Sequence, residues 1–419
     1  MTEQSPFKTA GTITDCPCCG HDLGPSFYEV GPVPVHSCLM LRTAPEARAF
    51  PSGTVSLSLC KGCGFVTNTA FDPKWSAYAP NYEDQQSFSA TFNSFAGTLA
   101  RSLVRRHGLD KGSVVEIGCS KGDFLHLLLE AGMSEATGID PSGVEGRVPP
   151  PSHGRMRLIP EYYGPAHIDL SCDLLCCRHT LEHIQPVHEM LRLMRRHAEQ
   201  HTGTVLCIEV PDATRVWRDI AFEDIYFEHC SYFTAGSLAA AVRRAGFSVT
   251  DLRREYENQY LVLEGSLDPS QDRFFEIEET PGETAIDIDR FSAGVRNVTR
   301  TWRETIQRET DGGRRIAIWG SGSKCVAFLK TLDVADRVAG IVDINPHRSG
   351  KFAPGLSVPI GPPEALAQVG PDRIIVMNDI YLPEIRKACA KLGVSAEIGG
   401  LSQAPLATTA MEQSGGRGR

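Results

Sequence analysis

Four cysteines near the start of the chain have the spacing of a metal site. Cys16 and Cys19 form one Cys-x-x-Cys pair, Cys60 and Cys63 form a second, and a glycine follows each pair. Two such turns can present four thiolates in a tetrahedron, the geometry of a structural zinc site. We therefore predict one structural zinc ion held by these four residues. Three neighbours are weaker candidate ligands: Cys18, Cys38 and His36.

A glycine-bearing turn separates a predicted strand from a predicted helix in the sequence VVEIGCSKGDF, residues 114–124. Such a turn lets a cofactor approach the backbone and the positive N-terminus of the helix. Asp140 ends the next strand, where an acidic residue accepts hydrogen bonds from ribose hydroxyls. The pattern indicates a nucleoside-containing cofactor. The alternatives are an ordinary strand-to-helix turn and, for Asp140, a turn residue before Pro141.

Two clusters of polar side chains follow later predicted strands, in the sequences RHTLEH (178–183) and YFEHCSYF (226–233). Ligands of open α/β sheets bind at the carboxyl ends of the strands, so both clusters should face the site. Histidine is the commonest general base, and tyrosine can donate to a developing oxyanion. We predict catalytic roles for His229, Tyr226, His183 and Glu228, and cofactor contacts for Arg178 and His179. A buried histidine with a purely structural role is the alternative.

Strand and helix patterns alternate through most of the chain, which is typical of an α/β fold. Before residue 71 the sequence is instead short, cysteine-bearing and punctuated by glycine and proline. Apolar residues recur every three or four positions from Phe291 to Ile306, which predicts an amphipathic helix. A second αβ alternation begins at RRIAIWG, residues 314–320. We predict the following division: a disordered N-terminus (1–13), a zinc module (14–70), a cofactor-binding domain (71–267), a linking helix (268–311), a C-terminal α/β domain (312–403) and a disordered tail (404–419).

The composition of the chain argues against several classes of function. The 419 residues carry a net charge of -9, which argues against a large nucleic-acid footprint. No apolar run reaches the ~20 residues that span a bilayer, and the first residues do not resemble a signal peptide. We therefore expect a cytoplasmic protein, with the 14 cysteines buried or bound to metal rather than paired in disulfides. A monomer acting on a small molecule is favoured.

The glycine turn and Asp140 resemble the class I S-adenosylmethionine (SAM) dependent methyltransferases, whose first motif reads E/D-x-G-x-x-x-G and whose second strand ends in an acid. The resemblance implies a Rossmann-like domain that binds SAM rather than a dinucleotide. It implies that Gly118, Gly122 and the surrounding loop, with Glu116 and Cys119, face the methionine part of SAM. Asp140 would hold the ribose.

The order of the parts, from about Cys16 to about Gly399, resembles the bacterial sugar C-methyltransferases. Those enzymes methylate carbon 3 of nucleotide-linked 4-keto sugars and have a zinc module, a SAM domain and a Rossmann-like C-terminal domain. The resemblance implies the four cysteines as zinc ligands, His229 as the base, Tyr226 as support for the enolate, and His183 in the substrate site. The implied activity is C-methylation next to a carbonyl.

The C-terminal domain carries a second glycine turn, with Gly320, Gly322 and Lys324 after the first strand and Asp343 at the end of the second. Two interpretations stay open: the turn binds a nucleotide moiety, or the C-terminal domain only completes the cleft. Asn378 and Tyr381, at the end of another predicted strand, are further candidate site residues. Three other functions stay open: O- or N-methylation of another metabolite, methylation of RNA gripped by the zinc module, and SAM binding without catalysis.

Overall fold

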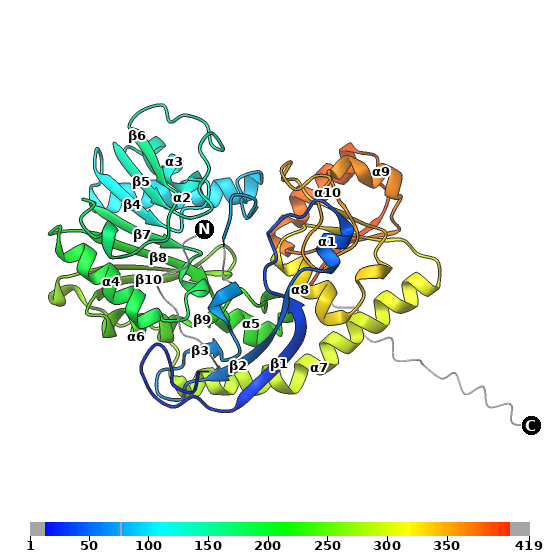
Figure 1. Cartoon of the computed structure of the whole chain (residues 1–419), viewed down its shortest axis with the longest axis horizontal. Coiled ribbons are helices and arrows are strands. Elements are labelled where there is room, and N and C mark those ends of the chain that lie inside the picture. Colours follow the sequence, from blue (N-terminus) through cyan, green and yellow to red (C-terminus); the bar gives the residue numbers. More distant parts are fainter. Residues whose placement is uncertain (1–12, 76–77, 403–419) are drawn as a thin grey trace, which may run out of the picture.

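The computed structural model describes residues 13–75 and 78–402, which are arranged around three β-sheets (Figure 1). The α/β class predicted from the strand and helix patterns is confirmed. The predicted disordered ends, 1–13 and 404–419, lie outside the described residues except for residue 13. The domain boundaries proposed above stay predictions.

A four-stranded antiparallel sheet carries the cysteine-bearing segment, in the order β1-β2-β3-β9. Its elements are β1 (Ser26–Pro34), α1 (Ala44–Arg48), β2 (Ser52–Leu59), β3 (Val66–Asn68) and β9 (Ser231–Tyr232). The first three strands come from the N-terminal segment, but β9 directly follows Cys230. The sheet therefore anchors the second predicted catalytic cluster at its edge.

A seven-stranded sheet forms the centre of the chain, in the order β10-β11-β8-β7-β4-β5-β6. Its strands are β4 (Ser113–Ile117), β5 (Glu135–Ile139), β6 (Arg155–Ile159), β7 (Leu174–Arg178), β8 (Val205–Pro211), β10 (Ser248–Glu255) and β11 (Tyr260–Ser266). The accompanying helices are α2 (Ala90–His107), α3 (Asp123–Glu130), α4 (Val187–Glu199), α5 (Ala213–Asp219) and α6 (Ala235–Arg244).

The strands of this sheet do not all run in the same direction. β6, β5, β4, β7 and β8 are parallel, whereas β11 runs antiparallel to both β8 and β10. β10 and β11 are joined by a tight turn in which Tyr256, Glu257 and Asn258 have φ values of 54°, 54° and 60°. A parallel pair needs a crossover of a dozen or more residues, so a connection this short forces a hairpin.

The C-terminal sheet is entirely parallel, in the order β14-β13-β12-β15-β16. Its elements are β12 (Ile316–Trp319), α8 (Ser323–Leu332), β13 (Gly340–Val342), β14 (Ile360–Gly361), α9 (Leu366–Val369), β15 (Arg373–Val376), α10 (Leu382–Lys391) and β16 (Glu397–Gly400). This order repeats the order β6-β5-β4-β7-β8 of the central sheet. Corresponding glycines after β4 and β12 also make the same bond: Gly118 N donates to the Ile139 carbonyl and Gly320 N to the Val342 carbonyl, both at 2.8 Å.

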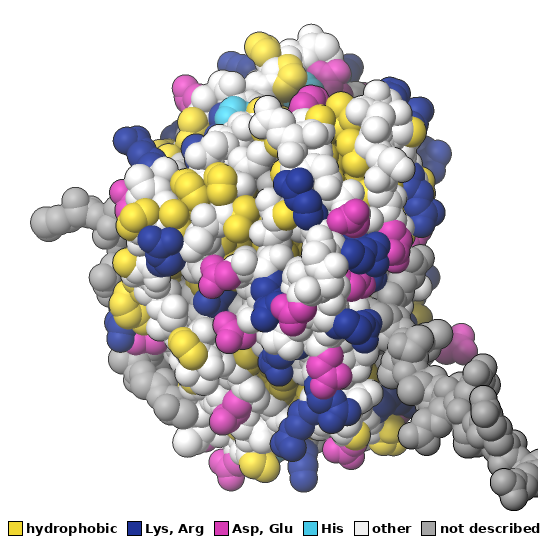
Figure 2. Space-filling model, turned by 90° about the vertical axis from the view of Figure 1, so that its right-hand side faces the viewer, with side chains coloured by type: hydrophobic (Ala, Val, Ile, Leu, Met, Phe, Trp, Pro, Cys, Tyr) yellow, Lys and Arg dark blue, Asp and Glu magenta, His cyan; other side chains and the backbone are white. Residues whose placement is uncertain are grey.

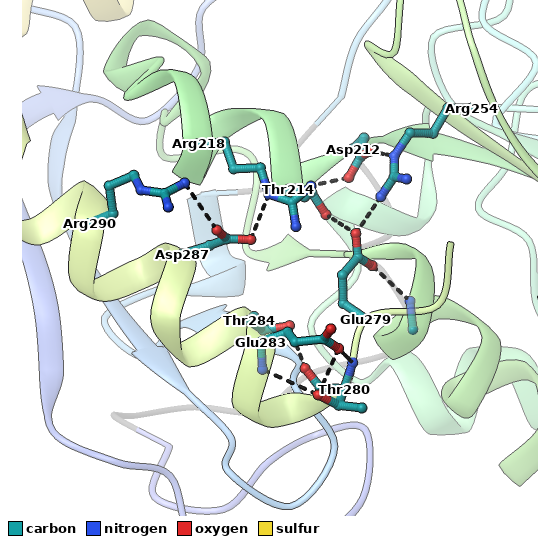
Figure 3. A network of polar contacts seen from close by, with 11 residues as sticks. Asp212, Thr214, Arg218, Arg254, Glu279, Thr280, Glu283, Thr284, Asp287 and Arg290 are labelled. Carbon is teal, nitrogen blue, oxygen red and sulfur yellow. Dashed lines mark hydrogen bonds and ion pairs between the residues drawn. The ribbon is translucent and has the colours of Figure 1, made fainter. Parts of the chain in front are cut away.

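The long helix α7 (Pro281–Asp311) occupies most of the predicted linking segment and runs beneath β1 and β2 toward the C-terminal sheet (Figure 1). Residues of its predicted apolar stripe, Phe291, Val295, Trp302 and Ile306, are buried. Figure 3 shows how its start is fixed to the central domain. Glu279, two residues before the helix, pairs with Arg254 and accepts a hydrogen bond from Thr214 Oγ1 at 2.9 Å. Arg218 Nε of α5 donates to Asp287 of α7 at 2.7 Å.

The face in Figure 2 has Lys and Arg side chains interspersed with Asp and Glu. Charges of both signs alternate there, whereas a nucleic-acid footprint requires clustered cations. Among residues 13–75 and 78–402, no helix combines the length and the hydrophobicity needed to cross a membrane.

Candidate active site and metal centre

A cavity of about 520 Å³ lies where the three sheets meet. Its lining includes Cys38 of the N-terminal segment, Asp140 and His229 of the central domain, and Lys324 and Asn345 of the C-terminal domain. Both predicted catalytic clusters and the first glycine turn open into it. The sequence motifs that lie far apart along the chain therefore share one site.

The first glycine turn forms one wall of the cavity. Gly118 has a φ of 70°, and a Cβ there would lie 1.9 Å from Thr180 Oγ1, so only glycine fits. Asp140 is held by two backbone amides: Ser120 N donates to Oδ2 at 2.8 Å and Ser142 N to Oδ1 at 2.6 Å. Glu116, Gly118, Cys119 and Asp140 line the cavity, whereas Gly122 lies at the N-cap of α3, outside the lining.

Glu116 suits a ligand that donates hydrogen bonds. Its carboxylate is buried, and burial raises its pKa to about 8 even though the charge of Arg178 lowers it. Oε2 has no hydrogen-bond partner among the described residues. A buried carboxylate oxygen without a donor is costly, and a cofactor ammonium or hydroxyl would satisfy it. The hydrogen-bond acceptors of this wall, Glu116 with Asp140 beside it, therefore fit SAM.

The segment from Tyr78 to Ser89 covers the same wall, a role that the sequence reading did not foresee. Ser120 Oγ donates to Asp84 Oδ1 at 2.6 Å, and Gln85 Nε2 donates to Asp123 Oδ2 at 2.8 Å. Burial, together with nearby Asp140, raises the pKa of Asp84 to about 6. Arg348 of the C-terminal domain donates through Nε to the Glu83 carbonyl at 3.0 Å. Nothing in the local sequence marks Asp84, because its partners lie far along the chain.

Arg178 and His179 share a carboxylate, that of Glu209 on β8. Arg178 donates to it through Nε and Nη2 at 3.0 and 3.1 Å, and His179 Nε2 lies 2.6 Å from Oε1. Burial would raise the pKa of Glu209, but the two cations lower it to about 2. Burial lowers the pKa of His179, but Glu209 and Glu182 raise it to about 9. Both predicted cofactor residues line the cavity, although the Arg178 guanidinium is already paired.

The predicted catalytic residues Tyr226, His229 and His183 meet in the cavity. Tyr226 Oη and His229 Nε2 are hydrogen-bonded at 2.9 Å, and the His183 and His229 rings lie edge to face at 4.8 Å. Tyr78 Oη is hydrogen-bonded to His183 Nδ1 at 2.8 Å. Burial, with the neighbouring histidines, lowers the pKa of His229 well below its usual value. His229 is therefore a neutral imidazole at pH 7, able to accept a proton.

Glu228, the fourth predicted catalytic residue, points elsewhere. It is buried outside the cavity lining and accepts hydrogen bonds from the N-terminal segment. The adjacency of Glu228 and His229 in the sequence does not bring both side chains to the same place.

The second glycine turn also borders the cavity, through Gly320, Gly322 and Lys324. The Asp343 carboxylate is occupied within the fold, because Ser321 N donates to Oδ2 at 2.7 Å and Asn345 N to Oδ1 at 2.8 Å. Lys324 Nζ pairs with Asp224 at 3.0 Å. Asn378 is hydrogen-bonded to Gln259, and Tyr381 to Tyr256. These two pairs join the C-terminal domain to the β10–β11 hairpin.

The four cysteines of the two knuckles come together. The thiols of Cys16 and Cys63 lie 3.7 Å apart and those of Cys19 and Cys60 3.4 Å apart, and all four sulfurs lie within 4.8 Å of one another. Zn–S bonds of ~2.3 Å in a tetrahedron separate the sulfurs by ~3.8 Å, so the set fits a zinc ion. Of the weaker candidates, Cys18 is buried beside the group and its thiol interacts with that of Cys63, whereas the other two lie elsewhere. His36 contacts Glu228, and Cys38 contacts Ser323.

Comparison with known proteins assigns two parts of the chain. Residues 92–252 match the methyltransferase domain family, and residues 267–396 match the C-methyltransferase C-terminal domain family. The C-methyltransferase NovU of Streptomyces niveus is 24% identical over 405 residues, which cover 89% of this chain and 91% of that protein.

Two solved structures show partial likeness. The 1,6-didemethyltoxoflavin-N1-methyltransferase of Burkholderia thailandensis is 18% identical and covers 41% of this chain and 77% of its own, with a TM-score of 0.30. The magnesium protoporphyrin IX methyltransferase of Synechocystis PCC 6803 is 16% identical and covers 44% of this chain and 90% of its own, with a TM-score of 0.33. Each likeness spans less than half of the chain.

Proposed function

We propose that this chain is a SAM-dependent methyltransferase of the bacterial C-methyltransferase family, and that it methylates a carbon next to a carbonyl in a small molecule such as a nucleotide-linked 4-keto sugar. The observation that carries the proposal is the hydrogen-bonded pair of Tyr226 and His229, which faces the same cavity as the glycine turn. A neutral base beside a hydroxyl donor is what enolisation of a ketone requires.

We propose that the wall formed by Glu116, Gly118, Cys119 and Asp140 holds SAM. Glu116 offers an unpartnered buried oxygen, and the Asp140 carboxylate is fixed by two backbone amides. Glycine at position 118 lets Thr180 pack directly against the turn, because a Cβ there would lie 1.9 Å from Thr180 Oγ1. SAM, when bound, supplies the electrophilic methyl group that an enolate carbon takes up.

The proposed role of His229 is to remove the proton from the acceptor carbon. The C–H bond breaks, its electron pair passes into the enolate, and Nε2 of His229 takes the proton. The Tyr226 hydroxyl, 2.9 Å from Nε2, then turns its hydrogen bond to the enolate oxygen. Burial raises the pKa of Tyr226 well above 10, so the hydroxyl keeps the proton that it donates. His183, fixed by Tyr78, completes the wall beside the base.

We propose that the nucleotide half of the acceptor lies toward the C-terminal domain. That end of the cavity contains Gly322 at the N-cap of α8 and Asn345, whose Nδ2 is buried without a hydrogen-bond partner among the described residues. Arg215 and Lys324 both pair with the carboxylate of Asp224 and border this end of the cavity. Burial lowers the pKa of Lys324 to about 7. Helix N-termini and cations are suited to phosphate groups.

We propose that the four cysteines bind a structural zinc ion, since their donor chemistry and spacing suit a closed tetrahedral site. The ion would tie the loop before β1 to the end of β2.

The test is to incubate the zinc-loaded protein with SAM bearing a ¹³C-labelled methyl group and a set of nucleotide-linked 4-keto sugars. Mass spectrometry detects the label and NMR locates it. Label on the carbon beside the ketone supports the proposal. Label on oxygen or nitrogen, or in no sugar at all, overturns the proposed acceptor.

A further inference from the structure

His36 of the N-terminal segment is buried against the second catalytic cluster, 192 residues away in the chain. Its Nδ1 lies 3.0 Å from Glu228 Oε2, and it is 3% exposed. The rings of Tyr78 and Tyr82 flank its imidazole, with centroids at 5.4 and 6.1 Å. The contact joins the segment between the two cysteine knuckles to the residue that precedes His229.

Both oxygens of the Glu228 carboxylate accept hydrogen bonds. Besides His36, the Ser37 backbone amide donates to Oε1 at 2.6 Å and the Tyr82 hydroxyl to Oε2 at 2.8 Å. Burial would raise the pKa of Glu228, but His36 and the other donors lower it. An ionised carboxylate accepts hydrogen bonds only, so His36 Nδ1 donates. Glu228 therefore has no free oxygen with which to take part in proton transfer.

These contacts fix the backbone on one side of the proposed base. His229 N is hydrogen-bonded to the Tyr226 carbonyl at 3.2 Å, and β9 begins two residues after His229. The segment 226–230 is thus held at its end by Cys230, whose amide donates to the Glu182 carbonyl at 3.0 Å, and by β9. In its middle it is held by Phe227, which is buried in the core against Phe71, and by Glu228, the anchor that reaches the N-terminal segment through His36. We infer that His36 is a positioning residue, which holds Glu228 and through it sets the place of His229 relative to the acceptor.

The inference rests on the proposed function of His229, and it gives the N-terminal segment a part in catalysis. A misplacement of about 1 Å of a reacting group can cost ~100-fold in rate. Loss of the His36 donor should therefore lower kcat, whereas the hydrogen bonds that hold Asp140 in the SAM wall, from Ser120 N and Ser142 N, do not involve His36.

The experiment compares His36→Leu with His36→Asn. The two replacements have nearly the same shape, but only Asn carries an NH₂ group at the place of Nδ1. We expect His36→Leu to lower kcat about 10- to 100-fold. We expect His36→Asn to stay within about 3-fold of the wild type, with the KM for SAM unchanged in both. Equal losses in the two variants would overturn the inference.

A double-mutant cycle tests whether His36 acts through Glu228. If it does, adding His36→Leu to Glu228→Leu lowers kcat no further, whereas independent effects multiply. Multiplying effects would refute the inference.

Hydrogen exchange gives a readout that needs no acceptor. His36→Leu should speed exchange in residues 226–233 and leave residues 14–24 at the zinc knuckle as in the wild type. If the wild-type protein methylates no keto sugar, the proposed acceptor is wrong, but the hydrogen-exchange measurement still tests the role of His36. Unchanged exchange in residues 226–233 would overturn the role.

Discussion

Replacing Glu209 by Gln should destabilise the central domain by about 3 kcal/mol. Glu209 is wholly buried on β8, and its carboxylate is the shared partner of Arg178 and His179. Its pKa is about 2 instead of the usual 4.5, and that difference corresponds to about 3 kcal/mol of stabilisation of the ionised form. The value agrees with the ~3–5 kcal/mol that breaking a buried ion pair costs. Gln would leave the buried Arg178 guanidinium without its hydrogen-bonded counter-charge and His179 with only the more distant Glu182, at 3.7 Å.

Urea unfolding at pH 7, followed by circular dichroism, measures the loss. The matched control is Glu135→Gln on β5, because Glu135 pairs with Arg155 at 2.7 Å on the surface, where water screens the pair. The control should leave the unfolding midpoint unchanged. If Glu209→Gln also leaves it unchanged, the reasoning about this buried network is wrong.

The pH dependence provides a second check on the same network. His179 has a pKa of about 9 in the folded state, above its ordinary 6.5. Its stabilising contribution is therefore complete below pH 6.5 and is lost as the pH rises through about 9. Wild-type protein should lose stability over this interval, and Glu209→Gln, which lacks the carboxylate that raises the pKa of His179, should lose less.

Three further changes have defined outcomes. Asp140→Asn removes the charge proposed to hold the ribose, and isothermal titration should show SAM binding weakened about 10- to 100-fold; unchanged affinity would place the ribose elsewhere. Cys60→Ser removes one of four thiolates, so metal analysis should show zinc lost from the purified protein, and full retention would exclude the proposed ligand set. Arg348→Ala frees the Glu83 carbonyl and loosens the segment over the SAM wall. The SAM Kd should rise about 5-fold, the worth of one hydrogen bond, and an unchanged Kd would show that this contact does not close the site.

Local patterns in the sequence were sufficient for the parts of the site whose residues lie close together in the chain. A Cys-x-x-Cys turn places its two thiols by itself, so the four-cysteine group followed from two short motifs. Gly118 and Asp140 lie within one strand–helix–strand unit, whose geometry is general to α/β folds. Tyr226 and His229 lie within one turn of chain, and their side chains are hydrogen-bonded.

The remaining features depend on tertiary contacts that no local pattern records. The partner of Glu228 is His36, and the partner of Ser120 is Asp84. Glu209 looks like an ordinary strand residue, but β8 lies beside β7 and places it under Arg178. The repeated strand order of the central and C-terminal sheets is a matter of topology, and the sequences of the two domains do not reveal it.

Deuterium exchange into the acceptor tests the central claim most directly. A nucleotide-linked 4-keto sugar that the enzyme methylates is incubated in D₂O with the protein and S-adenosylhomocysteine, which has no methyl group to transfer. If His229 removes the proton beside the ketone, NMR should show deuterium entering at that carbon with wild-type protein and not with His229→Gln. Equal exchange with both proteins would contradict the assignment of His229 as the base.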